Sequence, residues 1–154
     1  MNKGYYESPI GLLKIKAEEG YITEISFASK RNEENPSDEI RECIKELKEY
    51  FDGKRKSFDV KIKYAIGTDF QKKVWDALRK IEYGKTASYK DIAKLIGNEK
   101  ASRAVGSANN KNPILIIVPC HRIIGANGKL VGYAGGLDKK EKLLNHEKVY
   151  FKEI

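Results

Sequence analysis

Residues 114–123 read ILIIVPCHRI, an apolar run that ends in a proline followed by a cysteine, a histidine and an arginine. A short uncharged run rich in β-branched residues indicates a buried strand or an extended core segment. Pro119 has no N–H group and would end a strand there, which places Cys120 at the margin of the core. We therefore expect a thiol that is open enough to meet a substrate and close enough to a base or a cation to ionise.

The residues after Cys120 supply the partners that a reactive thiol needs. His121 is a candidate base, and a helix predicted from residue 137 to Glu147 carries a carboxylate that would orient an imidazole. Residues 125–128 read GANG, which predicts a turn, and residues 132–136 read GYAGG, where glycines allow close approach of the backbone. A Cys-His pair by itself is more often a small core side chain beside a surface residue, so that interpretation stays open.

The N-terminal part of the chain predicts a small α/β unit, an antiparallel sheet with one helix. Its predicted elements are a hairpin over residues 13–17 and 21–27, a helix from Ser37 to Asp52 that ends at Gly53, and a further strand over residues 58–62. We place the boundary near residues 65–67, which divides the chain into an N-terminal structural domain, residues 1–66, and a C-terminal domain, residues 67–154.

The C-terminal part predicts short helices. Thr68 and Gln71 have the spacing of a capping box, which opens a helix that Gly84 would end. A second helix is expected between Ser88 and Gly97, and a third over residues 101–109. Two short helices joined by a tight turn are typical of a helix-turn-helix, although many such pairs bind nothing and carry lysines only as a solvated face.

The formal net charge of +8 lies in the second half of the chain. Residues 1–69 hold 13 Lys and Arg against 14 Asp and Glu, whereas residues 70–154 hold 17 against 8. A basic balance can serve solubility alone. Its concentration beside the candidate nucleophile favours nucleic acid as a partner, because phosphate contacts supply most nonspecific affinity.

Several motifs together resemble the O6-alkylguanine-DNA alkyltransferases, also called methylated-DNA–protein-cysteine methyltransferases. The resemblance covers nearly all 154 residues. The matching stretches are SPIG at 8–11, YFDG at 50–53, SY at 88–89, ASRAVG at 101–106, NP at 112–113, PCHR at 119–122, GY at 132–133, GG at 135–136, LL at 143–144 and Glu147.

The resemblance implies a fold and a reaction. The N-terminal domain would be ribonuclease-H-like and the C-terminal domain winged-helix-like, mostly helical with a helix-turn-helix. Cys120 would attack the alkyl carbon on O6 of guanine, with His121 removing its proton directly or through water and Glu147 holding the imidazole. Tyr89 would donate or share a proton at guanine N3. The product is a thioether, which nothing in the chain can reverse, so we predict one turnover per molecule.

The resemblance also implies how the base and the DNA are held. Tyr133 and the backbone around Ala134 would form a wall near O6, the carbonyls of Cys120 and Val118 would accept from the guanine amino group, and Asn112 would brace the turn before the strand. The third helix would enter the minor groove, where Arg103 fills the gap left by a flipped guanine. Ala101, Ser102 and Ala104 would let this helix lie close to the DNA, and Arg122 would organise the site or meet phosphate.

Two departures from other members of this family matter. Ala134 stands where several members carry serine or tryptophan, so only its backbone can contribute there. Some members bind zinc through Cys and His in the N-terminal part, but Cys43 is the only such residue before Cys120, so we expect no metal and no cofactor. Cys43 itself is interpreted as a partly buried small side chain.

The expected partner is double-stranded DNA that contains O6-alkylguanine, with O4-alkylthymine as a second candidate lesion, and we expect a monomer. Two distant cysteines indicate a reducing compartment, and no leader or long apolar segment is seen, so we expect a cytoplasmic protein without membrane contact. Two other classes stay open: a non-catalytic DNA-binding module, as in the related alkyltransferase-like proteins, and a thiol hydrolase that uses Cys120, His121 and Glu147.

Overall fold

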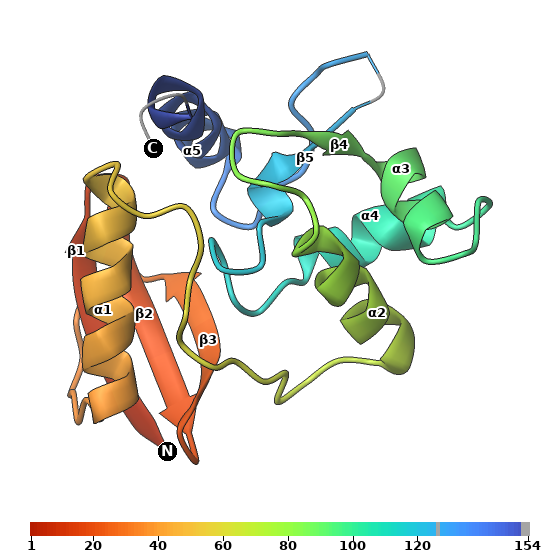
Figure 1. Cartoon of the computed structure of the whole chain (residues 1–154). Helices are drawn as coiled ribbons and strands as arrows, with labels where there is room; N and C mark the ends of the chain where they lie inside the picture. Colours follow the sequence, from red (N-terminus) through yellow and green to blue (C-terminus); the bar gives the residue numbers. More distant parts are fainter. Residues whose placement is uncertain (126, 152–154) are drawn as a thin grey trace.

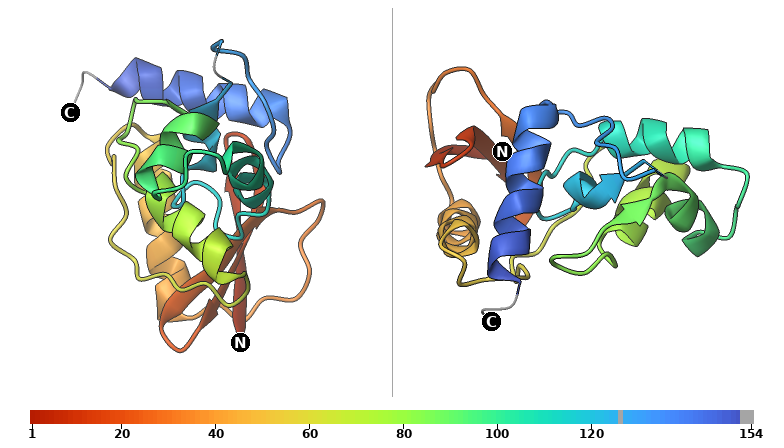
Figure 2. Two further views of the ribbon diagram at one scale, coloured as in Figure 1. Left: turned by 90° about the vertical axis from the view of Figure 1, so that its right-hand side faces the viewer. Right: turned by 90° about the horizontal axis from the view of Figure 1, so that it is seen from above.

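A computed structural model of the chain describes residues 1–125 and 127–151. Ala126, which belongs to the predicted GANG turn, lies outside the described residues. The polypeptide forms a small sheet unit and a mostly helical unit, and both were predicted (Figure 1). Seen from above, the last helix lies between the two units (Figure 2). Among the described residues, no helix has the length and apolar character needed to cross a bilayer.

The N-terminal sheet has three antiparallel strands in the order β1-β2-β3, with bounds β1 Asn2–Ser8, β2 Gly11–Glu18 and β3 Tyr21–Phe27. The predicted hairpin is confirmed: Leu13, Ile15 and Ala17 are buried and alternate with half-exposed lysines. Strand β1 was not predicted, because NKGYYES lacks an apolar alternation, yet it pairs with β2 along its whole length.

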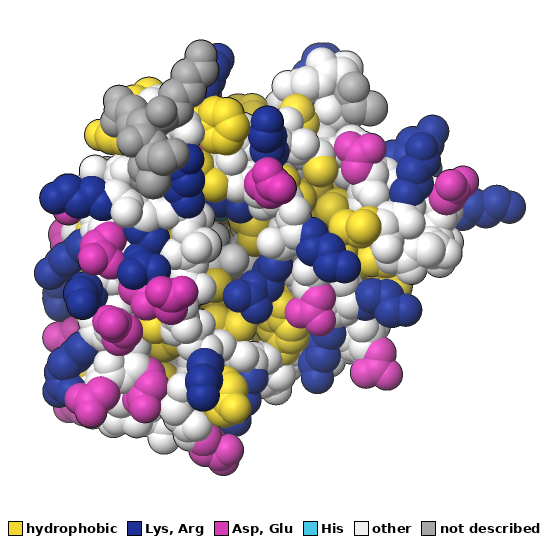
Figure 3. Space-filling model, in the orientation of Figure 1, with side chains coloured by type: hydrophobic (Ala, Val, Ile, Leu, Met, Phe, Trp, Pro, Cys, Tyr) yellow, Lys and Arg dark blue, Asp and Glu magenta, His cyan; other side chains and the backbone are white. Residues whose placement is uncertain are grey.

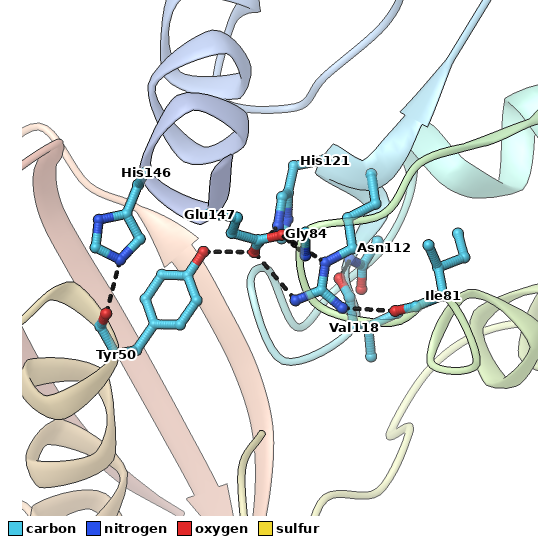
Figure 4. A network of polar contacts seen from close by, with 9 residues as sticks. Tyr50, Ile81, Gly84, Asn112, Val118, His121, His146 and Glu147 are labelled. Atoms are coloured by element: carbon cyan, nitrogen blue, oxygen red, sulfur yellow. Dashed lines mark hydrogen bonds and ion pairs between the residues drawn. The ribbon is translucent and has the colours of Figure 1, made fainter. Parts of the chain in front are cut away.

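Helix α1, Asp38–Phe51, packs on this sheet as its sequence predicts. The Ser37 hydroxyl accepts from the Ile40 backbone N–H, and Gly53 ends the helix with φ +76°. The buried side of the helix includes Cys43, which is fully buried. Tyr50, the last buried residue of the helix, points toward the helical unit (Figure 4).

The predicted strand over residues 58–62 is wrong. This segment touches the sheet at a single bridge, between Ile62 and Ile22 of β3. The cause is a buried carboxylate on α1: Glu46 accepts from the backbone N–H groups of Asp59, at 2.9 Å, and Val60, at 3.3 Å. Backbone donors that a strand would use for pairing are bound to a side chain instead.

The helical unit contains α2 Asp69–Leu78, α3 Tyr89–Leu95, α4 Ser102–Asn110, the 3₁₀ turn η1 Cys120–Arg122 and α5 Leu137–Tyr150, with a two-residue parallel pair formed by β4 Ala87–Ser88 and β5 Ile123–Ile124. The capping box of Thr68 and Gln71 is confirmed, and Ser88 and Asp91 form a second one at the start of α3. Helix α2 ends at Leu78, well before Gly84.

Helices α3 and α4 form the predicted helix-turn-helix pair and pack against α2. Helix α3 gives way to Gly97, whose φ of +80° turns the chain toward α4. Trp75 of α2 holds the buried side of α4, because its indole N–H donates to the Ala108 carbonyl oxygen at 2.8 Å. The exposed side of α4 is thereby held at a set orientation.

The run 114–118 is the extended core segment that was one of two expectations, not a strand. All five of its residues are buried, but it makes only isolated bridges, Ile114 to Ile25 and Leu115 to Val118. Ile116 adopts φ +73°, so the run folds back on itself. The backbone of Ile25 in β3 donates to Pro113 O and accepts from Leu115 N, both at 3.0 Å. The segment before the candidate nucleophile is therefore bonded to the N-terminal sheet.

The Trp75 hydrogen bond should contribute measurably to stability. Trp75→Phe keeps an aromatic ring but removes the buried donor to Ala108, so we expect a loss of about 1 kcal/mol in the free energy of unfolding. Tyr64→Phe is a matched control, because it removes the exposed hydrogen bond from Tyr64 to Asp76 and should cost less than about 0.5 kcal/mol. Equal losses in urea unfolding would contradict this assignment.

Candidate active site

Cys120 lies in η1 and is 1% exposed, deeper than the margin position that the sequence predicts. Burial raises the pKa of the thiol to about 11, although the Asn112 side chain and the positive charge of Lys140 lower it in part. The thiol is therefore protonated at neutral pH. Its reaction as a nucleophile requires a base.

The structure brings together His121 and Glu147, the two residues expected to provide a base. His121 Nε2 lies 2.7 Å from Glu147 Oε2, and both side chains are buried. Burial lowers the pKa of His121; the charge and hydrogen bond of Glu147 raise it, but burial together with the charges of Arg122 and Lys140 outweighs them, so the ring is neutral. Since a carboxylate only accepts, Nε2 carries the hydrogen, and Nδ1 keeps a lone pair for which no partner is found among the described residues. Nδ1 is the free proton acceptor.

Glu147 is the centre of a buried network (Figure 4). Besides His121, its carboxylate accepts from Arg122 Nε at 2.8 Å, Arg122 Nη2 at 3.0 Å and the Tyr50 hydroxyl at 2.6 Å. Burial alone would raise the pKa of Glu147, but its contacts with His121 and Arg122 outweigh this and hold the pKa well below its usual value. Glu147 therefore stays ionised and fixes the histidine tautomer.

Arg122 is directed into the interior. It is 7% exposed, donates from Nη1 to the Ile81 carbonyl oxygen at 2.6 Å, and stacks its guanidinium over the Tyr83 ring at 5.7 Å. Of the two roles expected for Arg122, these contacts support the organisation of the site. Arg122 also lines a cavity together with Lys56 and Arg79, and its contact with phosphate stays a prediction.

Tyr89 and Tyr133 both lie near the thiol of Cys120. Tyr89 begins α3 and its ring faces Gly106 of α4, where an added Cβ would lie 3.6 Å from the ring. The pKa of each hydroxyl is raised by burial and then by the charge of Cys120, which places both within its electrostatic reach. The Tyr133 hydroxyl is buried, with no hydrogen-bond partner in the described part of the chain.

Asn112 makes the contacts of a bracing residue. Its amide Nδ2 donates to Val118 O at 2.7 Å, and its Oδ1 accepts from Ile114 N at 2.9 Å. Val118 O also accepts from Cys120 N at 2.8 Å, so both of its lone pairs are occupied. The expectation that Val118 accepts from a guanine amino group is therefore not supported.

Except for Arg122, the residues expected to meet DNA lie at the surface. Arg103 and Ala104 are exposed, and Ala101 and Ser102 are half-exposed, at the start of α4, and Arg103 lies opposite the buried residues of this helix. Ala134 is also exposed. On the face drawn in Figure 3, acidic side chains gather mainly over the sheet and α1, as the uneven charge of the sequence predicts.

Two buried residues of the site were missed. Tyr50 reaches Glu147 from the N-terminal unit, and nothing in its helical pattern distinguishes it from a packed tyrosine. Lys140 is fully buried and donates to the carbonyl oxygens of Val131 and Gly132, and burial lowers its pKa to about 8. The only sequence signal of its burial was its position on α5: Lys140, Leu143 and Glu147 have the spacing of residues on one helical face.

A buried cysteine next in sequence to a histidine–carboxylate pair is an arrangement typical of proteins with a nucleophilic thiol. Residues 69–149 match the family model "6-O-methylguanine DNA methyltransferase, DNA binding domain", and residues 1–64 match "6-O-methylguanine DNA methyltransferase, ribonuclease-like domain". The chain therefore belongs to the 6-O-methylguanine DNA methyltransferase family.

Individual relatives agree with this assignment. The methylated-DNA–protein-cysteine methyltransferase of Methanosarcina acetivorans is 54% identical over 149 residues, which cover 92% of this chain and 95% of the relative. The constitutive methylated-DNA–protein-cysteine methyltransferase of Bacillus subtilis is 42% identical over 96% of this chain and 95% of the relative. The structure of Mycobacterium tuberculosis OGT in complex with DNA matches with a TM-score of 0.89 and 43% identity, over 97% of this chain and 94% of that chain.

Removal of the Glu147 charge should destabilise the protein in a pH-dependent way. Glu147→Gln leaves Arg122 buried without its counter-charge, so we expect a loss of about 3 kcal/mol at pH 7. The folded pKa of Glu147 lies below its unfolded value, so its contribution is complete above about pH 5 and shrinks as the pH falls through about 4. The difference between wild type and variant in urea unfolding should therefore narrow below pH 5. A difference that is constant with pH would contradict the assignment.

Proposed function

We propose that Cys120 is the acceptor residue of this protein, a DNA repair methyltransferase that moves an alkyl group from methylated DNA onto its own cysteine. The observation that carries the proposal is the free Nδ1 of His121 beside Cys120 in sequence, with Nε2–H fixed on Glu147. The substrate we propose is O6-alkylguanine in double-stranded DNA, with O4-alkylthymine as a second candidate lesion.

In the proposed reaction, His121 Nδ1 accepts the thiol proton directly or through one water molecule, and Glu147 stabilises the imidazolium that forms. The thiolate attacks the alkyl carbon in line. A sulfur–carbon bond forms as the carbon–O6 bond breaks, and the electron pair of the broken bond stays on the purine. The proton released by the thiol balances the one that guanine takes up, with Tyr89 donating or sharing a proton at N3. Tyr133 and the Ala134 backbone line the base.

The reaction ends at a thioether. Unlike an acyl-enzyme, a thioether offers no carbonyl carbon for water to attack, and its thiolate is a poor leaving group. We therefore propose one turnover per molecule. A thiol hydrolase would cycle, and a non-catalytic module that recognises lesions would stay unmodified, so both alternatives give different products.

For DNA, we propose that α4 enters the minor groove and that the target base leaves the duplex. O6 of a stacked, paired guanine is out of reach of a thiol, so extrusion is required. Arg103, exposed near the start of α4 among small residues, would occupy the vacated space. We also propose residues 1–66 and 67–154 as the two domains, a winged-helix-like arrangement for the second, a monomer, and a cytoplasmic location.

Intact-mass measurement tests the acceptor. After incubation with a duplex that contains O6-methylguanine, we expect a gain of one methyl group per molecule, located at Cys120 by peptide mapping. Cys120→Ser should show no gain while its affinity for the duplex stays within about twofold, because Cys120 is buried away from the exposed side of α4. Repeated turnover, or methyl on Cys43, would refute the proposal.

Arg103→Ala tests base extrusion. We expect methyl transfer from duplex DNA to slow by at least about tenfold, because the extruded base loses the side chain that stabilises the open stack. Transfer from the free O6-benzylguanine base, which needs no extrusion, should not change. Lys100→Ala, an exposed cation just before α4, is the matched control for loss of one charge. If the two substitutions slow transfer equally, Arg103 contributes only its positive charge to DNA binding and has no role in base extrusion.

A further inference from the structure

Gly135 is a glycine because of a side chain from the other unit. A Cβ added there would lie 2.4 Å and 2.6 Å from two ring carbons of Phe27, the last residue of β3, closer than carbon atoms approach without bonding. Gly135 is absent from the glycines of positive φ, so its backbone conformation is open to other residues. Gly136, by contrast, has φ +100° and is required by the backbone.

The Phe27 ring is held in place by a clamp from α5. Lys139 Nζ lies 4.9 Å from the ring centroid and donates to the Ile10 carbonyl oxygen at 2.9 Å. The SPIG turn presents that carbonyl: Ser8 Oγ donates to Gly11 O at 2.6 Å and accepts from Ile10 N at 3.2 Å. This gives a structural role to a motif that the reaction itself leaves unused.

The clamp bears on the segment that we propose to line the base. A Cβ at Gly135 would also lie 3.1 Å from the ring of Tyr133, and Gly136 N donates to Tyr133 O at 3.0 Å, so residues 133–136 form one tight turn. Phe27 and Ala134 line the same cavity of about 300 Å³. Displacement of Phe27 would therefore release the Tyr133–Gly135 segment toward the sheet.

We propose that Phe27 is a positioning residue that sets the location of the Tyr133–Gly135 segment and thereby the selectivity among O6-alkyl groups. This inference rests on the proposed function. The N-terminal sheet, which supplies no group to the reaction, then determines how closely the Tyr133 and Ala134 wall approaches the lesion. A methyl group, which is small, depends on close approach, whereas a benzyl group tolerates a segment that has moved back.

The first test is the selectivity of Phe27→Ala and of the milder Phe27→Leu. We expect methyl transfer from O6-methylguanine duplex to slow by about tenfold, since small displacements at a reacting centre cost large factors in rate. Transfer from the matching O6-benzylguanine duplex should slow by less than about threefold. The ratio of the two rates is the readout, because a purely structural loss would lower both equally.

The second test is suppression. Gly135→Ala introduces the clash with Phe27 and should slow methyl transfer by about a hundredfold. Adding Phe27→Ala removes the ring, so the double variant should transfer methyl at least about tenfold faster than Gly135→Ala alone. Gly136→Ala is the matched control: its fault is a backbone of positive φ, so Phe27→Ala should not rescue it. Thermal unfolding of every variant shows which ones are folded.

These outcomes separate the two proposals. If wild type gains no alkyl group, the proposed function fails. If wild type is alkylated but folded Phe27 variants keep the wild-type ratio of methyl to benzyl transfer, or Gly135→Ala is not rescued, the role of Phe27 is overturned while the function stands. The role of Phe27 is supported if the ratio of methyl to benzyl transfer changes and Phe27→Ala rescues Gly135→Ala but not Gly136→Ala.

Discussion

The buried carboxylate of Glu147 is the interaction on which the rest of the site depends. An ionised carboxylate in the interior is costly unless charge and hydrogen bonds compensate for it, and here His121, Arg122 and Tyr50 together do so. His121 and Arg122 are neighbours in η1, whereas Tyr50 comes from α1. One acid therefore fixes the histidine tautomer, holds the arginine in the interior and joins α1 to α5.

The two units are connected at three places around the candidate site. Tyr50 contacts Glu147 from the N-terminal unit, β3 is bonded to the segment before Cys120, and Phe27 at the end of that strand packs against Gly135. The N-terminal unit thus contacts the helix that carries Glu147, the backbone before Cys120 and the Tyr133–Gly135 segment. Substitutions on the sheet that leave stability intact can still change the reaction.

The sequence predicts best where the signal is local. The capping box at Thr68, the Ser37 cap and the alternation in β2 each follow from a few neighbouring residues, and each is confirmed. The contact between His121 and Glu147 was also predicted, because the family motif names both residues, while the chemistry of Cys120 stays a prediction. The strand over residues 58–62 failed for a non-local reason, since Glu46 binds the backbone donors on which that expectation depended.

The parts that could not be predicted depend on burial. Apart from its spacing along α5, nothing in the sequence separates Lys140 from the solvated cations of the basic half of the chain, yet it is buried and bonded to backbone carbonyls. Val118 shows the same limit for the backbone, because the use of both its lone pairs is visible only in three dimensions. A pattern of residue types indicates which polar groups are present. Which of their hydrogen-bonding positions remain unoccupied is seen only in the three-dimensional structure.

Burial of the thiol also suits a protein that is consumed by its own reaction. An exposed thiolate reacts with oxidants and with any electrophile, and each such event would remove a molecule from use. With its pKa raised to about 11 by burial, Cys120 stays protonated until a base is engaged. The lone pair of His121 Nδ1 is held ready by Glu147 without any charge on the ring. Reactivity then arises when a substrate brings an electrophilic carbon to the sulfur, which limits irreversible loss to the intended reaction.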